Sequence, residues 1–322
     1  MAALYHRLSA VNGVFSKDTI IDGQPARLEC LDIAGQTYAL SRGLATVVQL
    51  EDDWYDDVRD PDAVIAALKQ SPIRPDLFTF WQRLPETDRR FDFRTEWVSV
   101  ATLPVTTFDH WWNKQIKPET RNLVRKAQKK GVEVREASYD DDFVLGMTEI
   151  FNESPVRQGR RFWHYGKDFA TVKRQFSRHL FREILIGAYH GNELIGFMML
   201  GNAGRYAVVG QIVSKIRHRD KSPNNALLAR AVEVCEQRGL PHLVYAYWGD
   251  GPLIDFKRHN GFEEARLPRY WVALTRRGQL VLQAGLHRGW KALLPPTVKS
   301  RLKTVRSRLL AAASPRRPSG HG

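Results

Sequence analysis

The chain has 322 residues, of which 43% are hydrophobic and 26% are charged, the composition of an ordinary globular protein with room for two domains. Its two cysteines stand far apart, and no cysteine–histidine cluster has zinc-ligand spacing. This pattern argues against a disulfide framework or a structural metal and favours a reducing, cytoplasmic compartment. We expect no signal peptide and no membrane-spanning helix, because no run of about 20 apolar residues occurs.

The net charge of +14 is unevenly distributed along the chain. Glu264 is the last acidic residue, and thirteen of the 49 basic residues follow it, so residues 1–264 are nearly neutral. A nucleic-acid-binding protein would carry its basic face on the folded domain itself. We therefore assign most of the basicity to a C-terminal tail and do not expect a general nucleic-acid-binding protein.

The N-terminal third alternates short apolar runs with turn residues. Residues 26–40 read as a β-hairpin, with Ala34-Gly35-Gln36 at its turn. The acidic segment 51–62 could suggest a metal site. A solvated loop that caps the next helix, residues 63–69, explains it better, because carboxylates stabilise helix N-termini.

The middle of the chain begins with a basic helix at residues 118–130, closed by Gly131. Its lysines and arginines form either a solvated helix face or a phosphate contact. After a short strand and the helix 140–152 comes the loop 153–167, which is dense in aromatic, basic and hydrogen-bonding residues. Such loops often line binding sites, although a surface loop with a buried aromatic anchor has the same composition.

The last third carries the most regular pattern. It predicts a hairpin of residues 184–190 and 194–200, then a strand at 206–213, a helix at 224–238, a strand at 242–248, a short helix at 252–260 and a strand at 270–274. Ser222 is suited to cap the 224–238 helix and Pro223 to its first turn. A helix N-terminus beside the basic residues 215–221 is either an anion site or an ordinary strand–loop–helix connection.

Two motifs in this region resemble the GNAT superfamily of acyltransferases. Gly191-Asn192-Glu193-Leu194-Ile195-Gly196-Phe197 is similar to the hairpin motif of that superfamily. Asp255-Phe256-Lys257-Arg258-His259-Asn260-Gly261-Phe262 is similar to its Phe-x-x-x-x-Gly-Phe helix and turn. The resemblance implies an α/β (α+β) fold with a GNAT-like mixed twisted sheet flanked by helices.

One departure from the superfamily pattern narrows the resemblance. Users of acetyl-coenzyme A carry a glycine-rich pyrophosphate loop, whereas residues 219–225 contain no glycine. This departure, the Phe256-Lys257 pair and the basic helix resemble the FemAB-like branch, and the chain is also similar to uncharacterised GNAT-like proteins associated with surface polysaccharides. The branch has two tandem GNAT-like domains. It implies a degenerate first copy at 1–110, a basic connecting helix at 111–131 and an acyltransferase domain at 132–275. Residues 276–322 form the remaining basic amphipathic tail.

The resemblance implies attack of an amine on an activated acyl carbon, with acyl-CoA as the donor substrate and no metal. Lys257 resembles the FemAB-type lysine that would neutralise the tetrahedral intermediate or a donor phosphate, although a lysine on a short helix is more often only a surface group. The general base stays open among Glu153, His164 and Asp255. Tyr270 either protonates the leaving thiolate or is simply a packed strand residue. The predicted catalytic residues are Lys257, Glu153, His164, Asp255 and Tyr270.

Donor and acceptor are assigned to different segments. The backbone where the fourth strand ends would bind the oxyanion and the helix start would bind donor phosphate. The predicted donor-binding residues are Gln211, Ile212, Val213, Arg219, Ser222, Asn224 and Asn225. A guanidinium pair with aromatic neighbours suits a sugar, nucleotide or phosphate-bearing acceptor. The predicted acceptor-binding residues are Arg160, Arg161, Trp163 and Tyr165.

The tail predicts a cationic amphipathic helix over residues 296–310, in which Val298, Leu302, Val305 and Leu309 follow spacings of 4, 3 and 4. Such a helix suits an anionic membrane surface, and packing on the domain or contact with RNA are the alternatives. Residues 311–322 have a disordered composition.

The prediction is therefore a cytoplasmic N-acyltransferase, peripheral on the inner face of the membrane through its tail, that modifies an amino sugar or similar amine of an envelope glycan precursor. Two alternatives stay open. One is an aminoacyl-tRNA-dependent transferase of the FemAB type, and the other is a catalytically inactive module that binds a glycan or a protein partner.

Overall fold

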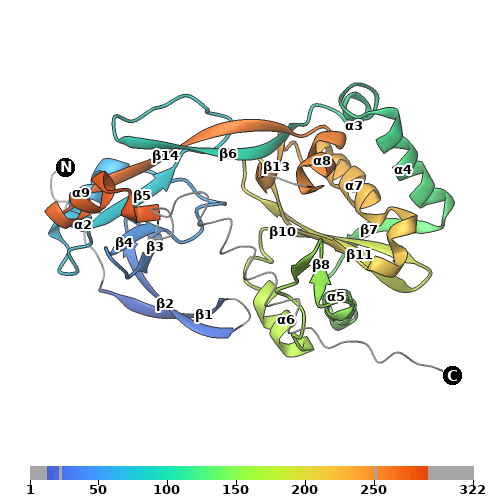
Figure 1. Ribbon diagram of the computed structural model, residues 1–322, viewed down its shortest axis with the longest axis horizontal. Coiled ribbons are helices and arrows are strands. Elements are labelled where there is room, and N and C mark those ends of the chain that lie inside the picture. Colours follow the sequence, from blue (N-terminus) through green and yellow to red (C-terminus); the bar gives the residue numbers. More distant parts are fainter. Residues whose placement is uncertain (1–12, 22–23, 250–251, 289–322) are drawn as a thin grey trace.

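The computed structural model describes residues 13–21, 24–249 and 252–288. Twelve strands form one mixed sheet with the order β1-β2-β3-β4-β5-β14-β6-β13-β12-β11-β10-β7, and β8 and β9 form a separate two-stranded sheet. The N-terminal half contains β1 (Phe15–Ile21), β2 (Gln24–Ile33), β3 (Gln36–Ser41), β4 (Val47–Leu50), α2 (Pro61–Gln70) and β5 (Leu77–Trp81). The sheet twists along its length, with helices on its faces (Figure 1).

The rest of the chain returns to the sheet several times. The middle segment contains β6 (Arg94–Pro104), α3 (Phe108–His110), η1 (Trp111–Gln115), α4 (Pro118–Lys129), β7 (Val132–Ala137), α5 (Asp141–Asn152), β8 (Val156–Arg157), β9 (Arg160–Arg161) and α6 (Phe169–Phe176). The last segment contains β10 (Glu183–His190), β11 (Glu193–Asn202), β12 (Ala207–Ser214), η2 (Ile216–Lys221), α7 (Pro223–Gln237), β13 (His242–Tyr247), α8 (Pro252–His259), β14 (Glu263–Ala273), α9 (Arg276–Gln283) and η3 (Leu286–Arg288).

The two halves of the sheet repeat one pattern. Strands β2, β3 and β4 form an antiparallel meander, and α2 leads to β5, which is parallel to β4. Strands β10, β11 and β12 form a second meander, and α7 leads to β13, which is parallel to β12. The next strands along the chain cross over, because β6 pairs with β13 and β14 pairs with β5. The fold is thus two tandem GNAT-like units, of which the first is the smaller, joined by two long central strands (Figure 1).

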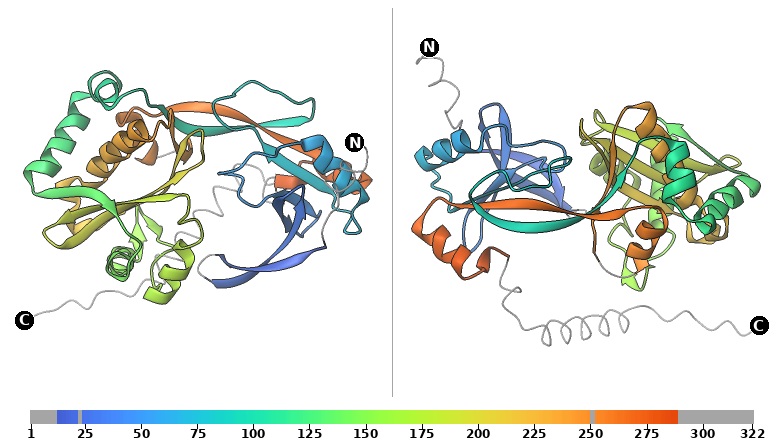
Figure 2. Two further views of the ribbon diagram at one scale, coloured as in Figure 1. Left: turned by 180° about the vertical axis from the view of Figure 1, so that it is seen from behind. Right: turned by 90° about the horizontal axis from the view of Figure 1, so that it is seen from above.

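Helices cover both faces of the second half. On one face α7 packs on β10 to β12 and α4 packs on α7 and β7, with Val124, Ile186 and Leu228 in their shared core. On the other face α5 and α6 enclose a separate core that includes Phe151 and Phe197. Figure 2 shows these helices on opposite sides of the strands. Residues two apart along a strand point to the same face, so the sequence alternates between the two cores.

Local sequence signals explain where the helices begin. Asp60 caps α2 by accepting a hydrogen bond from the Ala63 backbone, with Pro61 in the first turn, as the acidic segment predicts. Ser222 occupies the N-cap position of α7, but it has a left-handed backbone with φ of 54° and makes no side-chain cap hydrogen bond. Here the prediction of a side-chain cap is wrong, because the preceding η2 turn enters the helix through that backbone conformation.

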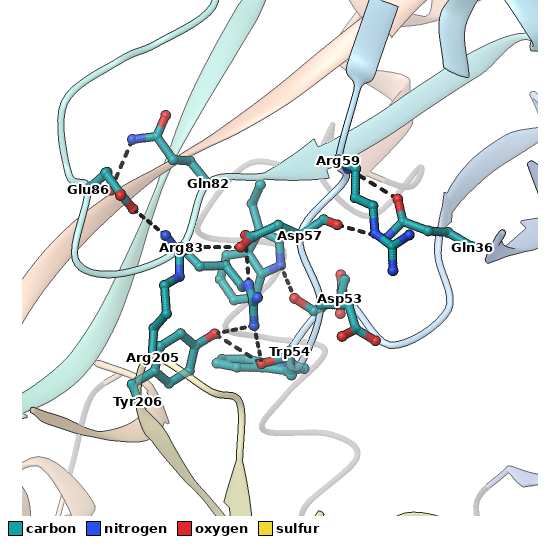
Figure 3. Close-up of polar contacts among 12 residues, drawn as sticks. Gln36, Asp53, Trp54, Asp57, Arg59, Gln82, Arg83, Glu86, Arg205 and Tyr206 are labelled. Atoms are coloured by element: carbon teal, nitrogen blue, oxygen red, sulfur yellow. Dashed lines mark hydrogen bonds and ion pairs between the residues drawn. The ribbon is translucent and has the colours of Figure 1, made fainter. Parts of the chain in front are cut away.

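The acidic segment does more than cap α2. Asp57 receives a hydrogen bond from the buried Arg83 at 2.8 Å and another from Arg205 at 2.5 Å (Figure 3). The Arg83 guanidinium also reaches the Trp54 carbonyl and the Tyr206 hydroxyl, each at 3.2 Å. We call Trp54, Asp57, Arg83, Arg205 and Tyr206 the clamp. It joins the first half to the turn before β12, so the segment is not only a solvated loop.

The region assigned to the tail is partly folded. Helix α9 packs Val281 and Leu282 against Leu77 of β5, and Thr275 caps it. The predicted amphipathic helix at 296–310 lies outside the described residues. The domain limits at 110 and 275 stay predictions, since β6 and β14 run through both halves. Within the described ranges, no helix combines the length and the apolar character needed to cross a bilayer.

Candidate functional site

The centre of the candidate site is the point where β12 and β13 separate. These parallel neighbours pair at only two positions, Ala207 with Leu243 and Val208 with Val244. Beyond them β12 continues beside β11, and β13 continues beside β6. Backbone groups of β12 that point towards β13 past Val208 therefore find no ladder partner on that strand.

Each of the two strands carries an irregularity at this point. The register of β12 against β11 shifts at Gly210, between the pairs of Met199 and Leu200. The register of β13 against β6 shifts between Val244 and Tyr247, where Ala246 has a positive φ of 48°. Bulges bend strands and are common beside active sites, and a left-handed alanine is a strained residue that the surrounding structure holds in place. Together they open the sheet at one place.

Lys257 lies at the end of the opened strand. Its side chain is buried, 1% exposed, and Nζ donates a 2.5 Å hydrogen bond to the carbonyl of Tyr247, the last residue of β13. The ammonium also lies 4.8 Å from the centre of the Tyr245 ring. Burial lowers the pKa of Lys257 to about 8, because removing the ammonium from water disfavours its charged form. A buried lysine whose pKa is strongly lowered is a candidate for a functional residue.

The start of α7 adjoins α8. Asn225, 9% exposed, faces Asn260 at the end of α8, with Nδ2 and Oδ1 3.4 Å apart. The neighbouring Asn224 has a buried side-chain oxygen that no group in the described ranges contacts by hydrogen bond. The start of α7 thus contacts the residue that follows α8, the helix that carries Lys257. That the two share one donor stays a prediction.

The basic loop before α7 is largely neutralised. Lys215 is buried and donates to Glu149 at 2.6 Å and to Glu193 at 2.7 Å. Glu193 also accepts a hydrogen bond from Arg217 and lies 3.1 Å from His218. Burial raises the pKa of Glu193, but Lys215 and Arg217 outweigh it and hold this pKa down to about 2. Arg219, which is predicted to bind the donor, lies on η2 and is exposed to solvent. Glu149 and Glu193 thus form ion pairs with most of the basic residues that were predicted to bind an anion.

Glu153, one candidate base, anchors this loop. Its carboxylate accepts hydrogen bonds from the backbones of Ile216 and Arg217, the second at 3.0 Å, and lies 3.4 Å from Arg157. Arg157 in turn donates to the carbonyls of Ser214 and Ile150, both at 2.7 Å. Both side chains therefore fix the end of β12 against α5.

His164, another candidate base, is inside the loop 153–167. It is 1% exposed and stacks on Phe151, with ring centres 4.3 Å apart. Burial and the nearby Lys167 and Arg157 lower the pKa of His164 to about 3, so the ring is neutral near pH 7. Lys167 Nζ lies 3.2 Å from Nδ1, and a lysine can only donate, so the proton is on Nε2. The lone pair that a base needs is thus already engaged.

The other predicted residues are dispersed. Asp255 is exposed on α8. Tyr270 is fully buried in the N-terminal half, where its hydroxyl bonds Gln82 at 2.9 Å and the Arg90 backbone at 2.9 Å, so the structure does not bring it to Lys257. Gln211, Ile212 and Val213 lie on β12 at the separation. The acceptor candidates are exposed on and after the β8–β9 hairpin, namely Arg160, Arg161, Trp163 and Tyr165.

A cavity of about 830 Å³ lies beside the separation, on the face of the sheet covered by α6. The β1–β2 hairpin and the end of α6 lie side by side and form two of its walls (Figures 1 and 2). Gly210 and Gln211 of β12 form part of its floor with Met199 and Glu183. None of the predicted acceptor residues lines it. Glu183 was missed because a single carboxylate at a strand start gives no sequence signal.

Within the described residues, no three histidine, cysteine or acidic side chains gather in a way that could hold a metal ion. The chain was compared with known proteins. A scan against protein-family models finds no match, and a search of curated proteins finds none either. Among solved structures, FemX superposes with a TM-score of 0.51 at 11% identity, covering 87% of this chain and 92% of its own. The C-terminal domain of a putative lysylphosphatidylglycerol synthetase from Agrobacterium fabrum gives 0.52 at 11% identity, covering 79% and 86%. The chain therefore has a GNAT-like fold of the FemAB type.

Proposed function

We propose that the protein is an N-acyltransferase, which transfers an acyl group from an activated donor to an amine. The observation that carries this proposal is the separation of β12 from β13 with a buried lysine at its edge. The likeness to FemX and to the putative lysylphosphatidylglycerol synthetase domain supports the fold on which the proposal rests.

The geometry supports a direct transfer. The neutral amine attacks the acyl carbon, and the carbonyl oxygen becomes an oxyanion that unpaired β12 backbone N–H groups near Gly210 would stabilise. The C–S or C–O bond to the leaving group then breaks, and the amine nitrogen loses its extra proton to solvent or to a base. Lys257, at the Tyr247 carbonyl, would lower the energy of the negative charge that develops.

The donor end of the site is the start of α7. Its first-turn N–H groups and the side chain of Asn224 would bind the donor, and Asn225 contacts Asn260, three residues after Lys257. We propose acyl-CoA as the donor, held there by its phosphates. The acceptor amine would approach from the opposite face, through the cavity floored by Gln211.

A second donor is favoured by a specific surface. Helix α4 exposes Arg125, Lys126 and Lys129 along one side, and Lys130 pairs with Asp220 of η2 at 2.6 Å, which places this side beside the start of α7. An aminoacyl-tRNA would use such a ridge for its phosphates. The absence of glycine in residues 219–225 fits this donor better than the pyrophosphate of coenzyme A.

A binding experiment separates the two donors. The full chain is titrated with acetyl-CoA, and in a second arm with aminoacylated and RNase-treated tRNA, while its melting temperature is followed. A ligand that binds only the folded state adds about 2.7 kcal/mol at about 100 times its Kd. We expect acetyl-CoA to raise the melting temperature of the wild type. In Asn224→Ala most of this increase should be lost.

The matched control is Asn192→Ala, an exposed asparagine in the β10–β11 turn, which should keep the full stabilisation. Stabilisation by intact tRNA alone would replace acyl-CoA with the second donor. If neither donor stabilises the protein, the transferase proposal is wrong.

A further inference from the structure

The cavity beside β12 contains polar groups that the fold leaves unused. Glu183 lies on its floor, and one of its carboxylate oxygens is buried without a hydrogen-bond partner in the described part of the chain. The other oxygen has a single long contact, 3.4 Å from the Tyr55 hydroxyl. Buried carboxylates are normally well paired, so this one is available to a ligand.

His179 adds a second unused group to the same cavity. Its Nε2 lies 3.6 Å from Asp52, whereas the buried Nδ1 has no partner within the described ranges. Gln211 places a third polar side chain on the floor and makes no side-chain hydrogen bond to described residues. All three groups offer acceptor atoms, and the Gln211 amide also offers donors, which suits a ligand with several hydroxyl or ammonium groups.

The walls of the cavity carry positive charge. Arg174 on α6 is exposed and makes no ion pair within the described residues, while Arg27 on the hairpin has only a solvent-exposed partner, Asp18, at 3.4 Å. Lys17 and Arg178 are held by Glu51. Arg174 is thus the cation of this wall that is best placed to meet an anionic group of the ligand.

We propose that this cavity binds the acceptor, and that the acceptor is a hydroxyl-rich amine carrying a phosphate, such as an amino sugar phosphate. Glu183 and His179 accept hydrogen bonds from the sugar, Arg174 binds the phosphate, and Gln211 holds the end that faces the separation of β12 from β13. A volume of about 830 Å³ accommodates a ligand of this size. The inference rests on the proposed transferase function for the identity of the amine as acceptor, and it moves the acceptor site away from Arg160 and Arg161.

The test is calorimetric titration of the full chain, without donor, with glucosamine 6-phosphate and with uridine diphosphate glucosamine, which distinguish a free from a nucleotide-linked sugar. Glucose 6-phosphate reports the contribution of the amine, and inorganic phosphate that of the anion alone. We expect Arg174→Ala to raise the Kd of the tighter amino sugar probe by about tenfold, as loss of a hydrogen bond to a charged group predicts. Burial raises the pKa of Glu183 to about 7, so in a titration above that pH, where the carboxylate is ionised, Glu183→Gln should raise the Kd by about the same factor.

The matched controls are Glu264→Gln and Arg94→Ala, an exposed carboxylate and an exposed guanidinium outside the cavity, and they should leave the Kd within about twofold of the wild type, since surface groups away from a site contribute little. Melting temperatures of all four variants check that each is folded. The proposal is overturned if neither amino sugar probe binds, or if inorganic phosphate binds as tightly as the two amino sugar probes. It is also overturned if Glu183→Gln and Arg174→Ala have the same Kd for the probe as the control variants.

Failure of this inference is distinguishable from failure of the proposed function. Binding that depends on Glu183 and Arg174, without acyl transfer from either donor, would leave the cavity as a sugar phosphate site and remove the transferase. If Glu183→Gln and Arg174→Ala both transfer the acyl group to an amine with the wild-type KM, the transferase function stands and the cavity is not the acceptor site. Mass spectrometry of the acceptor distinguishes these results.

Discussion

At the scale of single residues, Lys257 gives a prediction whose sign is fixed by burial. Its pKa falls from 10.5 to about 8 on folding, so between these values the unfolded chain binds the proton and the folded chain does not. The free energy of unfolding should therefore rise across this pH window in the wild type relative to Lys257→Met. Urea denaturation of both proteins at several pH values from 7 to about 10.5 measures it. Parallel pH profiles would show that the ammonium is not desolvated.

Single residues of the candidate site can be predicted from the sequence only where a motif contains them. Lys257 was predicted because it follows Phe256 in a motif with fixed spacing, and the structure places it at the strand separation. Arg157 and Glu183 carry no such motif. Their surroundings are made by residues distant in sequence, since Arg157 contacts Ser214 and Glu183 lies near Tyr55. A charged residue is recognisable as unusual only when its burial is known.

At the scale of elements, the docking of α9 depends on one glycine. A Cβ added at Gly278 would lie 2.1 Å from the Asp76 carbonyl oxygen, which belongs to the backbone and cannot rotate away. Alanine in a helix is otherwise favoured over glycine by about 1 kcal/mol, but the clash should win. We expect Gly278→Ala to lower the free energy of unfolding by about 1–3 kcal/mol. Gln279→Ala, on the exposed side of the same helix, should be neutral or slightly stabilising. A gain in stability for Gly278→Ala would contradict this packing.

Elements with local signals were predictable, and their long-range pairing was not. Helix α7 begins at Pro223 and ends beside Gly239, whose φ is 65°, close to the predicted limits. The exchange of β6 and β14 between the halves is different, because it is determined by pairing between residues such as Thr102 and Glu263 that are far apart in the chain. Apolar alternation predicts that a strand exists and which side is buried, but not its neighbour.

At the scale of the whole molecule, the clamp should couple the two halves. Arg83 is 4% exposed and contacts both the Trp54 carbonyl in its own half and Tyr206 in the other. Arg83→Met would leave Asp57 with Arg205 alone and remove the hydrogen bonds of the buried guanidinium to the Trp54 carbonyl and the Tyr206 hydroxyl, which should cost about 2–3 kcal/mol. Arg59→Met, at an exposed arginine of the same acidic segment, is the control and should change little. If the clamp couples the halves, Arg83→Met will also broaden urea unfolding into two transitions, seen as a lower apparent m-value. An unchanged midpoint and slope would mean that β6 and β14 hold the halves together without it.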